Sequence, residues 1–185
     1  MAEVSSPIQH TLVELAIAGE RRAFDRLYQL WQARWYRFVL RQCTNPATAE
    51  DVLQNGVLEM VKNIGRLRDP QSFTAWSFVI LRRACAMHVR RKVVQREKEA
   101  SAVAAECAEE PAAPEDPRLT DLSVALTALS ADQQNLLALF YSYGLSIAEL
   151  AKVYEVPTGT IKSRLHHLRE TLKHKILSDE ETHDV

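Results

Sequence analysis

The chain contains 185 residues, of which 46% are hydrophobic and 25% are charged. This is enough apolar material for one medium-sized core or two small ones, which argues against a chain that is disordered throughout. No stretch approaches the roughly 18 uninterrupted apolar residues that a membrane-spanning helix needs, and the three cysteines form no closely spaced disulfide framework. We therefore expect a protein of the reducing cytoplasm that does not insert into a membrane.

The charges are unevenly distributed, although 23 basic and 24 acidic residues leave a net charge of only −1. Residues 1–95 hold 14 Lys and Arg against 8 Asp and Glu, a balance of +6, whereas residues 96–118 hold 3 against 7, a balance of −4. The second segment also contains three prolines, and its composition is typical of a solvated linker. We predict two domains, 1–95 and 119–177, joined by a flexible acidic linker, 96–118, and followed by a frayed acidic tail, 178–185.

Apolar residues in the first predicted domain recur at spacings of three and four, the pattern of amphipathic helices packed on a core. A short helix near Ile8–Ala18 is expected to open this four-helix domain. Gly65 is expected to end the second long helix as a left-handed cap, and Ser72 to be the N-cap of the last one. The residues expected on the core faces of the three long helices are Phe24, Leu27, Tyr28, Leu30, Trp31, Trp35, Phe38 and Val39, then Val52, Leu53, Val57, Met60, Val61 and Ile64, then Phe73, Trp76, Val79, Ile80, Ala84 and Met87.

The second predicted domain contains two capping-box patterns, Ser130 with Gln133 and Ser146 with Glu149, and each marks the start of a helix. The first of these helices is expected to end at Gly144 and the second to run from Ile147 to about Tyr154. A tight turn through residues 155–159 leads to a last helix beginning near Thr158. This order predicts a helix-turn-helix. The last helix of this motif would bury Ile161, Leu165, Leu168, Leu172 and Ile176. A further helix, on Leu119, Leu122, Leu126 and Leu129, is expected at the start of the second domain.

The last predicted helix has the features of a DNA-reading helix. A helix fits the major groove, and side chains near its N-terminal end reach base edges while the helix dipole favours nearby phosphates. Lys162 and Arg164 supply cationic donors, and Ser163 is short enough to let the backbone approach DNA. From spacing alone, a solvated basic surface is the more frequent explanation of such residues.

Several motifs resemble those of a known family. Ala148-Glu-Leu-Ala151, followed by Pro157-Thr-Gly-Thr-Ile-Lys-Ser-Arg-Leu165, resembles the promoter-recognition helix-turn-helix of sigma factors of the extracytoplasmic-function (ECF) group. Ala49-Glu-Asp-Val-Leu-Gln54 resembles the family's polymerase-docking helix, and Phe73-Thr-Ala-Trp76 through His88-Val-Arg-Arg91 its promoter-melting helices. The resemblance covers both predicted domains in the family's order. It implies an all-α protein of two small helical domains that directs RNA polymerase core enzyme to specific promoters and initiates transcription.

The resemblance also implies roles for individual residues. The family's docking helix binds the clamp helices of the largest polymerase subunit, and its second domain binds the flap of the second-largest subunit. The implied polymerase-binding residues are Asp51, Gln54, Asn55 and Leu58. The upstream (−35) promoter element would be read by Lys162, Ser163, His166 and His167, with Arg164 on phosphate. The opened downstream (−10) element, with one base flipped out, would be bound by Arg68, Asp69, Ser72 and Phe73 of a loop and by Arg82, Arg83, Arg90 and Arg91 along the backbone path.

The chain departs from the family pattern at some of these positions. Relatives usually carry an acidic residue where this chain has Asn55, an aromatic one where it has Val57, Asn where it has Arg83, Asp where it has Met87, and Arg where it has His167. A histidine cannot make the bidentate guanine contact of an arginine, which contributes roughly 1–3 kcal/mol of discrimination. We therefore expect altered docking energetics and a preferred promoter sequence that differs from the common one.

Other residues are not assigned to a site. Trp76 has the spacing of a core aromatic residue, which we favour over a role in base stacking. Cys85 and His88 lie three residues apart on a predicted helix, but they are half of a metal site without a second half, so no metal is expected. With five glycines and no phosphate-binding loop, paired catalytic carboxylates or Ser/His/Asp signature, the chain is expected to have no cofactor and no enzymatic activity.

Two functions from other classes stay open on the sequence. A sigma-like decoy would use the same fold to sequester an anti-sigma protein without a DNA-reading helix, and the cluster Lys162-Ser-Arg164 argues against it. A stand-alone helix-turn-helix regulator would bind its operator without polymerase, usually as a symmetric dimer, and the two-domain organisation argues against that. The expected partners are the polymerase core and promoter DNA, with an anti-sigma factor as a further candidate.

Overall fold

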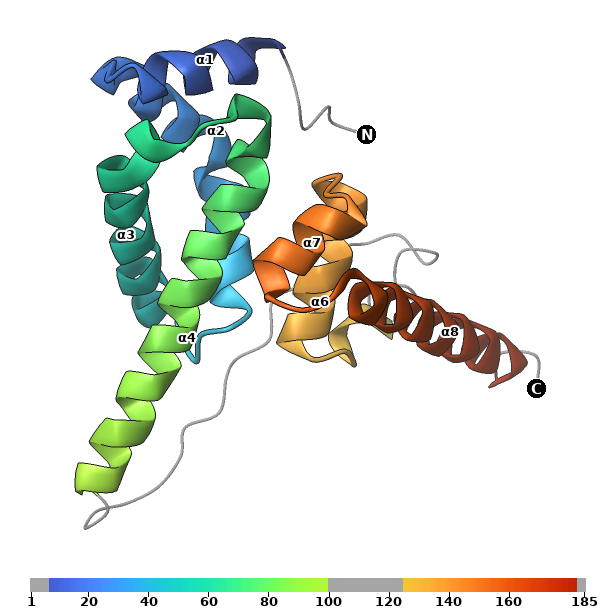
Figure 1. The fold of residues 1–185 in the computed structure, drawn as a ribbon. Helices are drawn as coiled ribbons and strands as arrows, with labels where there is room; N and C mark the ends of the chain where they lie inside the picture. Colours follow the sequence, from blue (N-terminus) through green and yellow to red (C-terminus); the bar gives the residue numbers. More distant parts are fainter. Residues whose placement is uncertain (1–6, 100–124, 183–185) are drawn as a thin grey trace. The chain divides into compact units, whose positions relative to one another are not determined.

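The computed structural model describes residues 7–99 and 125–182, and the side chains of residues 7–91 and 125–175. All regular elements in these residues are helices, and the chain forms two compact units (Figure 1). This confirms the prediction of an all-α protein with two helical domains. Most of the predicted linker lies outside the described residues. Within the described ranges, no helix is both long and apolar enough to cross a membrane.

Among the residues that the structure describes, the first unit contains four α-helices with short connections. The opening helix α1 packs on α2 and on two short 3-10 turns, while α4 packs against both α2 and α3 (Figure 1). The last helix extends four residues beyond the domain boundary that the sequence predicts at residue 95. The elements are α1 (Pro7–Ile17), α2 (Arg21–Leu40), α3 (Pro46–Asn63), the 3-10 turns η1 (Ile64–Arg66) and η2 (Pro70–Ser72), and α4 (Phe73–Glu99).

Aromatic side chains form the centre of this unit. Trp31 and Trp35 of α2 stack with ring centroids 6.2 Å apart, and Phe38 lies 5.1 Å from Phe78 of α4. The Trp35 indole N–H donates to Ser77 Oγ over 3.2 Å, which satisfies a polar group that burial would otherwise strip of water. Each such fully buried aromatic side chain contributes about 1.5–3 kcal/mol relative to exposure. The core therefore ties α2 to α4 directly.

Close approach of α3 to α4 depends on a glycine. A Cβ atom on Gly56 would lie 2.7 Å from Cδ2 of Leu81, a buried side chain of α4.

Asn45 starts α3 by accepting the Thr48 N–H at its side chain over 2.8 Å, and Pro46 follows in the first turn, where its missing N–H costs nothing. Asn45 and Pro46 thus mark the start of a helix.

Some predictions for this unit are wrong. Gly65 is not a left-handed cap, because the chain continues from α3 directly into η1 and does not need to reverse there. Ser72 is not an N-cap, because it lies inside η2, whose N-cap is Asp69. Three residues predicted in the core are about half exposed, namely Leu30, Val61 and Met87, whereas Phe78 and Leu81 are fully buried and were not predicted.

The second unit contains shorter helices with explicit caps. Both predicted capping boxes are confirmed: Ser130 N–H donates to Gln133 Oε1 and Ser146 N–H to Glu149 Oε2, each over 2.8 Å, and each serine side chain accepts the reciprocal backbone N–H. Gly144, with φ 66°, follows a π-helical turn. The elements are α6 (Ala131–Leu137), the π turn η3 (Ala138–Ser142), α7 (Ile147–Tyr154) and α8 (Thr158–Thr182), preceded by helical residues 125–127.

The ends of the helices in the second unit differ from the prediction in two respects. Helix α6 ends at Leu137, and a π turn follows it before Gly144. The starts of α7 and α8 are confirmed at Ile147 and Thr158. However, α8 continues to Thr182, so residues 178–182 of the predicted frayed tail are helical. Leu119 and Leu122, two of the four leucines predicted on the first helix, lie outside the described residues.

Candidate DNA-binding and polymerase-binding surfaces

The turn between α7 and α8 fixes the start of the predicted reading helix. Glu155 ends α7 in the left-handed region, with φ 54°, and Val156 N–H donates to Ala151 O over 3.1 Å. A left-handed conformation costs a residue with a side chain roughly 1–2 kcal/mol. Pro157 lacks an N–H and cannot continue the preceding helix, and α8 begins at the next residue. The first turn of α8 is therefore placed by a short, locally constrained connection.

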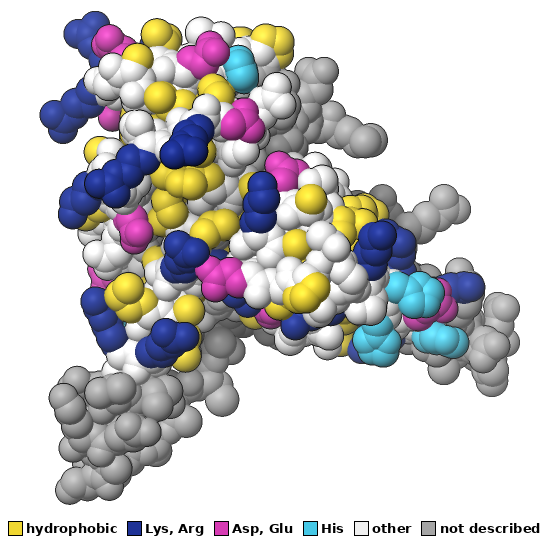
Figure 2. All heavy atoms as spheres, viewed as in Figure 1, with side chains coloured by type: hydrophobic (Ala, Val, Ile, Leu, Met, Phe, Trp, Pro, Cys, Tyr) yellow, Lys and Arg dark blue, Asp and Glu magenta, His cyan; other side chains and the backbone are white. Residues whose placement is uncertain are grey.

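One side of α8 is buried and the other is open to ligands. Three residues of the predicted apolar face, Ile161, Leu165 and Leu168, are at most 2% exposed, whereas Leu172 is only half-buried. Figure 2 shows histidine side chains gathered along α8, together with Lys and Arg. All five residues predicted to contact the upstream element are exposed: Lys162, Ser163, Arg164, His166 and His167.

These five residues do not form a single row. Lys162 and His166 are one helical turn apart on one flank of α8. Arg164 and His167 occupy the other flank, where they line a groove together with Asp132 in the first turn of α6. Ser163 lies between the two flanks, and its hydroxyl donates to Thr160 O over 3.0 Å, which leaves its oxygen as an acceptor. By this geometry Lys162, Ser163 and His166 can enter a groove of DNA together.

The π turn anchors α8 through a contact that the sequence did not predict. Arg169 Nε donates to the Tyr141 hydroxyl oxygen over 2.6 Å. The Arg169 guanidinium also lies 5.8 Å from the ring centroids of both Phe140 and Tyr141. Because the two partners are 28 positions apart, no local pattern could have indicated the pair. This contact holds the middle of α8 against the π turn η3.

The loop between α3 and α4 is organised around Asp69. Its Oδ1 accepts the Gln71 N–H over 3.0 Å, and its Oδ2 accepts the Ser72 hydroxyl over 2.7 Å. The hydrogen bond from Ser72, helped by that from Gln71 N–H and by the nearby His10, lowers the pKa of the Asp69 carboxyl below its usual value. Asp69 therefore presents a fixed, ionised acceptor at the surface next to the exposed Arg68.

Helix α1 supports this loop from the other side, which the sequence reasoning missed. Gln9 Nε2 donates to Thr74 Oγ1 over 3.4 Å, across 65 positions of sequence. Helix α1 also packs on both η1 and η2. The signal available in the sequence was weak, because Gln9 and His10 are ordinary polar residues on a short amphipathic helix.

The arginines predicted along α4 fall on different sides of the helix. Trp76, Arg83 and Arg90 are spaced by seven residues, so they follow one stripe of the surface, and both arginines are exposed. Arg82 is half-buried and is rotated by about 100° from Arg83 around the helix axis. Arg91 lines a groove between α3 and α4. Arg83 and Arg90 thus lie on the same side of α4, at increasing distance from the loop between α3 and α4.

Phe73 corrects one prediction about the downstream site. Its side chain is fully buried, with its ring centroid 6.2 Å from those of Trp31 and Trp35. A side chain enclosed in this way cannot contact an unstacked base, so its role is to support the loop from beneath. Trp76 is half-buried with its ring 6.1 Å from that of Phe73, which agrees with the predicted packing role.

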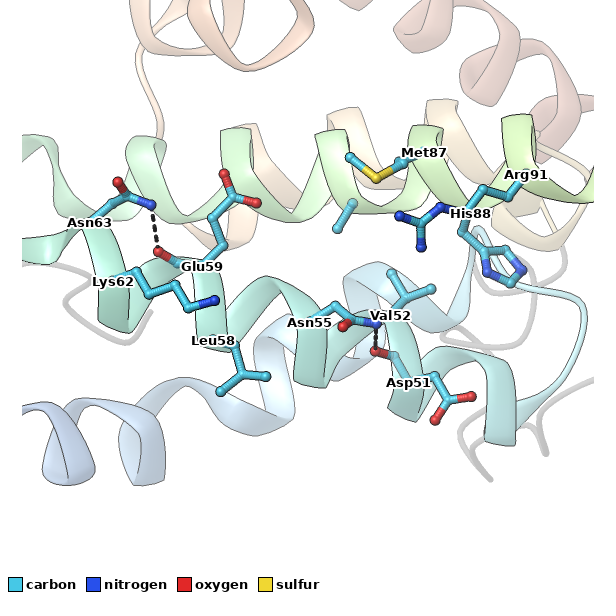
Figure 3. A pocket seen from close by; sticks show the side chains of 11 residues that line it. Asp51, Val52, Asn55, Leu58, Glu59, Lys62, Asn63, Met87, His88 and Arg91 are labelled. Atoms are coloured by element: carbon cyan, nitrogen blue, oxygen red, sulfur yellow. Dashed lines mark hydrogen bonds between the residues drawn. The ribbon is translucent and has the colours of Figure 1, made fainter.

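The outer face of α3 forms the third candidate surface. Asp51, Gln54, Asn55 and Leu58 are all exposed on the side of α3 opposite its buried residues. Three of them line a groove of about 410 Å³ between α3 and α4, which Figure 3 shows from close by. Leu58 is 50% exposed and is the apolar centre of this face. The structure therefore brings the four predicted polymerase-binding residues together on one surface.

Two departures from the family pattern lie in this groove. Asn55 Nδ2 donates to Asp51 O over 2.8 Å, so the amide is bound to its own helix and adds no negative charge (Figure 3). Met87 is 50% exposed on the α4 side. With Asn55 and Met87 in place of the acidic residues that relatives usually carry, this groove is less acidic and more apolar than the corresponding groove of those relatives.

Cys85 and His88 do not come together as a metal site. Cys85 is buried, whereas His88 is half-buried and lines the groove. Among the side chains that the structure describes, no group of three or more His, Cys, Asp or Glu residues is arranged to hold a metal ion.

Comparison with known proteins gives consistent results. The family models Sigma-70 region 2 and Sigma-70, region 4 match residues 27–94 and 119–172. The ECF RNA polymerase sigma factor BldN of Streptomyces coelicolor is 31% identical over 185 residues, covering 97% of this chain and 69% of BldN. The RNA polymerase sigma-H factor of Pseudomonas aeruginosa is 27% identical over 175 residues, covering 87% and 90% of the two chains.

Solved structures show the same fold. The sigma factor RpoE from Bartonella quintana, solved in complex with the anti-sigma factor NepR, matches with a TM-score of 0.66 and 25% identity over 84% of this chain and 98% of that one. CnrH, solved in complex with the cytosolic domain of CnrY, has a similar fold, with a TM-score of 0.61 at 19% identity over 93% of this chain and 99% of that one.

The two helical units match sigma-70 regions 2 and 4 in that order, and the second unit ends in a helix-turn-helix. A chain with this organisation is a transcription initiation factor of the sigma-70 class. Within that class, the chain belongs to the ECF RNA polymerase sigma factors. It acts in promoter-specific initiation of transcription, with RNA polymerase and promoter DNA as its partners. The resemblance in the sequence motifs is thereby confirmed. As a family, sigma factors are not enzymes.

Proposed function

We propose that this sigma factor divides promoter recognition among three surfaces. The docking face, defined as Asp51, Gln54, Asn55 and Leu58, binds the clamp helices of the largest polymerase subunit. The loop surface, defined as Arg68, Asp69, Ser72, Arg83 and Arg90, captures the opened non-template strand. The reading face, defined as Lys162, Ser163 and His166 with Arg164 and His167 on the flank, contacts the upstream duplex.

The observation that supports this proposal most is that the residues of the docking face and of the reading face are all exposed. The four residues of the docking face share the outer side of α3, and the five residues at the start of α8 lie opposite its buried apolar face. Residues spread along a sequence for purely structural reasons would fall on buried and exposed sides alike.

The chemistry of the loop surface suits an unpaired base. A carboxylate accepts hydrogen bonds from exocyclic amino groups such as that of cytosine, and the bonds from Ser72 and Gln71 hold the Asp69 carboxylate in place. Arg83 and Arg90 supply positive charge along one line for the phosphates of the same strand. Arg82 and Arg91 lie off this line, and we assign them to more distant backbone contacts.

Polymerase is needed because each surface alone is small. Contacts to phosphates weaken steeply as salt rises to cellular levels, and each of the two candidate DNA surfaces offers only a few cations. When both units are docked on polymerase, binding of one unit to DNA makes DNA binding by the other unit effectively intramolecular. The overall affinity for the promoter is then much higher than that of either unit alone. The flap of the second-largest subunit is the expected anchor for the second unit. We also propose that an anti-sigma factor binds this chain, since RpoE and CnrH were solved with such partners.

Transcription with purified polymerase core tests the proposal. Core enzyme alone and core with this chain would be incubated with fragmented genomic DNA, and the 5′ ends of the transcripts sequenced. We expect new start sites that share one pair of sequence elements only when the chain is present. A decoy would give no new start sites, and a stand-alone regulator would bind duplex DNA equally well without the core.

The docking face has its own test. Leu58→Asp places a charge at the apolar centre of the face, and we expect core binding to weaken at least about tenfold, because a buried unpaired charge at an interface costs several kcal/mol. Leu15→Asp on α1 is the matched control, since Leu15 is 44% and Leu58 50% exposed. An equal loss of binding to polymerase core enzyme in both variants would show that α3 is not the docking helix.

A further inference from the structure

Two of the three cysteines meet in the first unit. Cys43 lies in the turn between α2 and α3, and Cys85 lies on α4, 42 positions later in the sequence. The two side chains lie close enough to interact, and neither cysteine forms a disulfide. Cys85 is 2% exposed, whereas Cys43 is only half-buried. None of the three surfaces described above uses either residue.

The two thiols have different environments. The hydrogen bond with the Cys43 side chain, together with burial, raises the pKa of the Cys85 thiol. A buried thiol that keeps its proton is a poor first nucleophile, whereas a thiol at the surface can lose its proton and meet an oxidant. A solvent-accessible cysteine beside a second, resolving cysteine is the arrangement found in redox-sensing proteins.

We propose that Cys43 and Cys85 are a redox-active pair that closes to an intramolecular disulfide when the protein meets a hydroperoxide. In the first step the Cys43 thiolate attacks one peroxide oxygen. The O–O bond breaks, Cys43 becomes a sulfenic acid, and the other oxygen leaves and is protonated to water or an alcohol. In the second step the Cys85 sulfur attacks the Cys43 sulfur. The S–O bond breaks, the Cys85 proton goes to the departing oxygen, and a molecule of water leaves. The two thiols have then lost two electrons and the peroxide has gained them.

The fold makes this closure feasible because the two residues have unequal freedom. Cys85 is fixed in the middle of α4, one turn from both Arg82 and His88, while Cys43 sits in a turn without regular structure. Because the two side chains already interact, a movement of that turn can bring the sulfurs to the roughly 2.05 Å of an S–S bond. The bond would link the α2–α3 turn to the helix that carries Arg83 and Arg90.

Mass spectrometry of the full-length protein tests the pair. The reduced protein would be treated with hydrogen peroxide, free thiols blocked with iodoacetamide, and proteolytic peptides examined without reduction. We expect a peptide linking Cys43 to Cys85, two hydrogen atoms lighter than the sum of its parts, in wild type and in Cys107→Ser. Linkage mainly through Cys107, or oxidation of Cys43 that leaves Cys85 as a free thiol, would overturn the proposal.

Two single variants test the order of the steps. In Cys85→Ala the sulfenic acid on Cys43 has no resolving partner, so we expect it to be trapped by dimedone. In Cys43→Ser we expect Cys85 to remain unlabelled by dimedone at the same peroxide dose, with unchanged far-UV circular dichroism showing that the variant is folded. Dimedone labelling of Cys85 in folded Cys43→Ser would show that Cys85 reacts first and contradict the assigned roles.

Discussion

The two units are stabilised in different ways. The first has long helices whose fully buried aromatic residues, Trp31, Trp35, Phe38, Phe73 and Phe78, contact one another across α2 and α4. The second has short helices, two complete capping boxes, a π turn and a left-handed residue between α7 and α8. The first unit is therefore specified by packing between distant residues, and the second to a larger extent by local backbone chemistry.

This difference affects how each unit presents its surface. In the first unit the docking face and the loop surface are the outer sides of elements fixed from within, so the exposed residues can vary while the core holds their positions. In the second unit the direction of α8 depends on a few caps and turn residues near its start. We expect changes in the core to affect the first unit strongly, and changes in capping to have their largest effect in the second.

The largest expected effect comes from the aromatic core. Trp35→Ala removes a fully buried side chain and leaves Ser77 Oγ without its indole donor, and we expect a loss of about 3–5 kcal/mol in the free energy of unfolding. All three tryptophans, Trp31, Trp35 and Trp76, lie in the first unit. Tryptophan fluorescence in a urea titration of the full chain therefore reports on this unit alone.

The matched control is Leu30→Ala on the same helix. Leu30 is 49% exposed, so this change should cost no more than about 0.5 kcal/mol. If the two variants unfolded at similar urea concentrations, the aromatic cluster would not be the main source of stability in the first unit.

The next effect concerns the start of α8. Lys162→Ala removes a cation from the reading face, and we expect transcription from promoters that depend on the upstream element to fall about tenfold, in line with roughly 1–3 kcal/mol for a specific contact. Lys173→Ala is the control, because Lys173 is exposed on the same side of α8 three helical turns later. Transcription with reconstituted holoenzyme measures both, and an equal fall would show that charge along α8 matters more than position.

Loss of one cap should have a smaller effect, confined to the second unit. Ser146→Ala removes the side chain that accepts the Glu149 N–H at the start of α7, and we expect a cost of about 1 kcal/mol. Amide hydrogen exchange of the full chain would show faster exchange in α7 and unchanged protection in α2. Ser142→Ala, also exposed but outside the capping box, should leave α7 unchanged. Faster exchange spread evenly over both units would contradict the local character of the second unit.

Much of this difference between the two units could be predicted from the sequence. What could not be predicted depends on contacts between residues that are distant in the sequence. The capping boxes and the bounds of α7 were predictable because a cap depends on residues three positions apart. The periodicity of α3 indicated the helix but not which apolar residues are buried, since Val61 and Met60 are neighbours and only the position of α4 decides between them. The contacts of Arg169 with Tyr141 and of Gln9 with Thr74 were not predictable, because no local pattern joins residues 28 and 65 positions apart.

The smallest predicted effect is on the ionisation of Asp69 in the loop surface. Ser72→Ala removes the hydrogen bond that contributes most to lowering the pKa of this carboxyl, so its pKa should rise toward the usual aspartate value. A group with a lowered pKa in the folded state stabilises the fold at a pH above its unfolded pKa, and this contribution is lost as the pH falls through the folded pKa. The variant should therefore lose that contribution at a slightly higher pH than wild type. Carboxyl carbon NMR during an acid titration measures the shift directly, and Ser72→Thr, which keeps the hydroxyl, should restore the wild-type curve. An unchanged Asp69 titration in Ser72→Ala would mean that the backbone bond from Gln71 alone holds the loop, and that the first unit, like the second, relies on local backbone contacts at its candidate DNA surface.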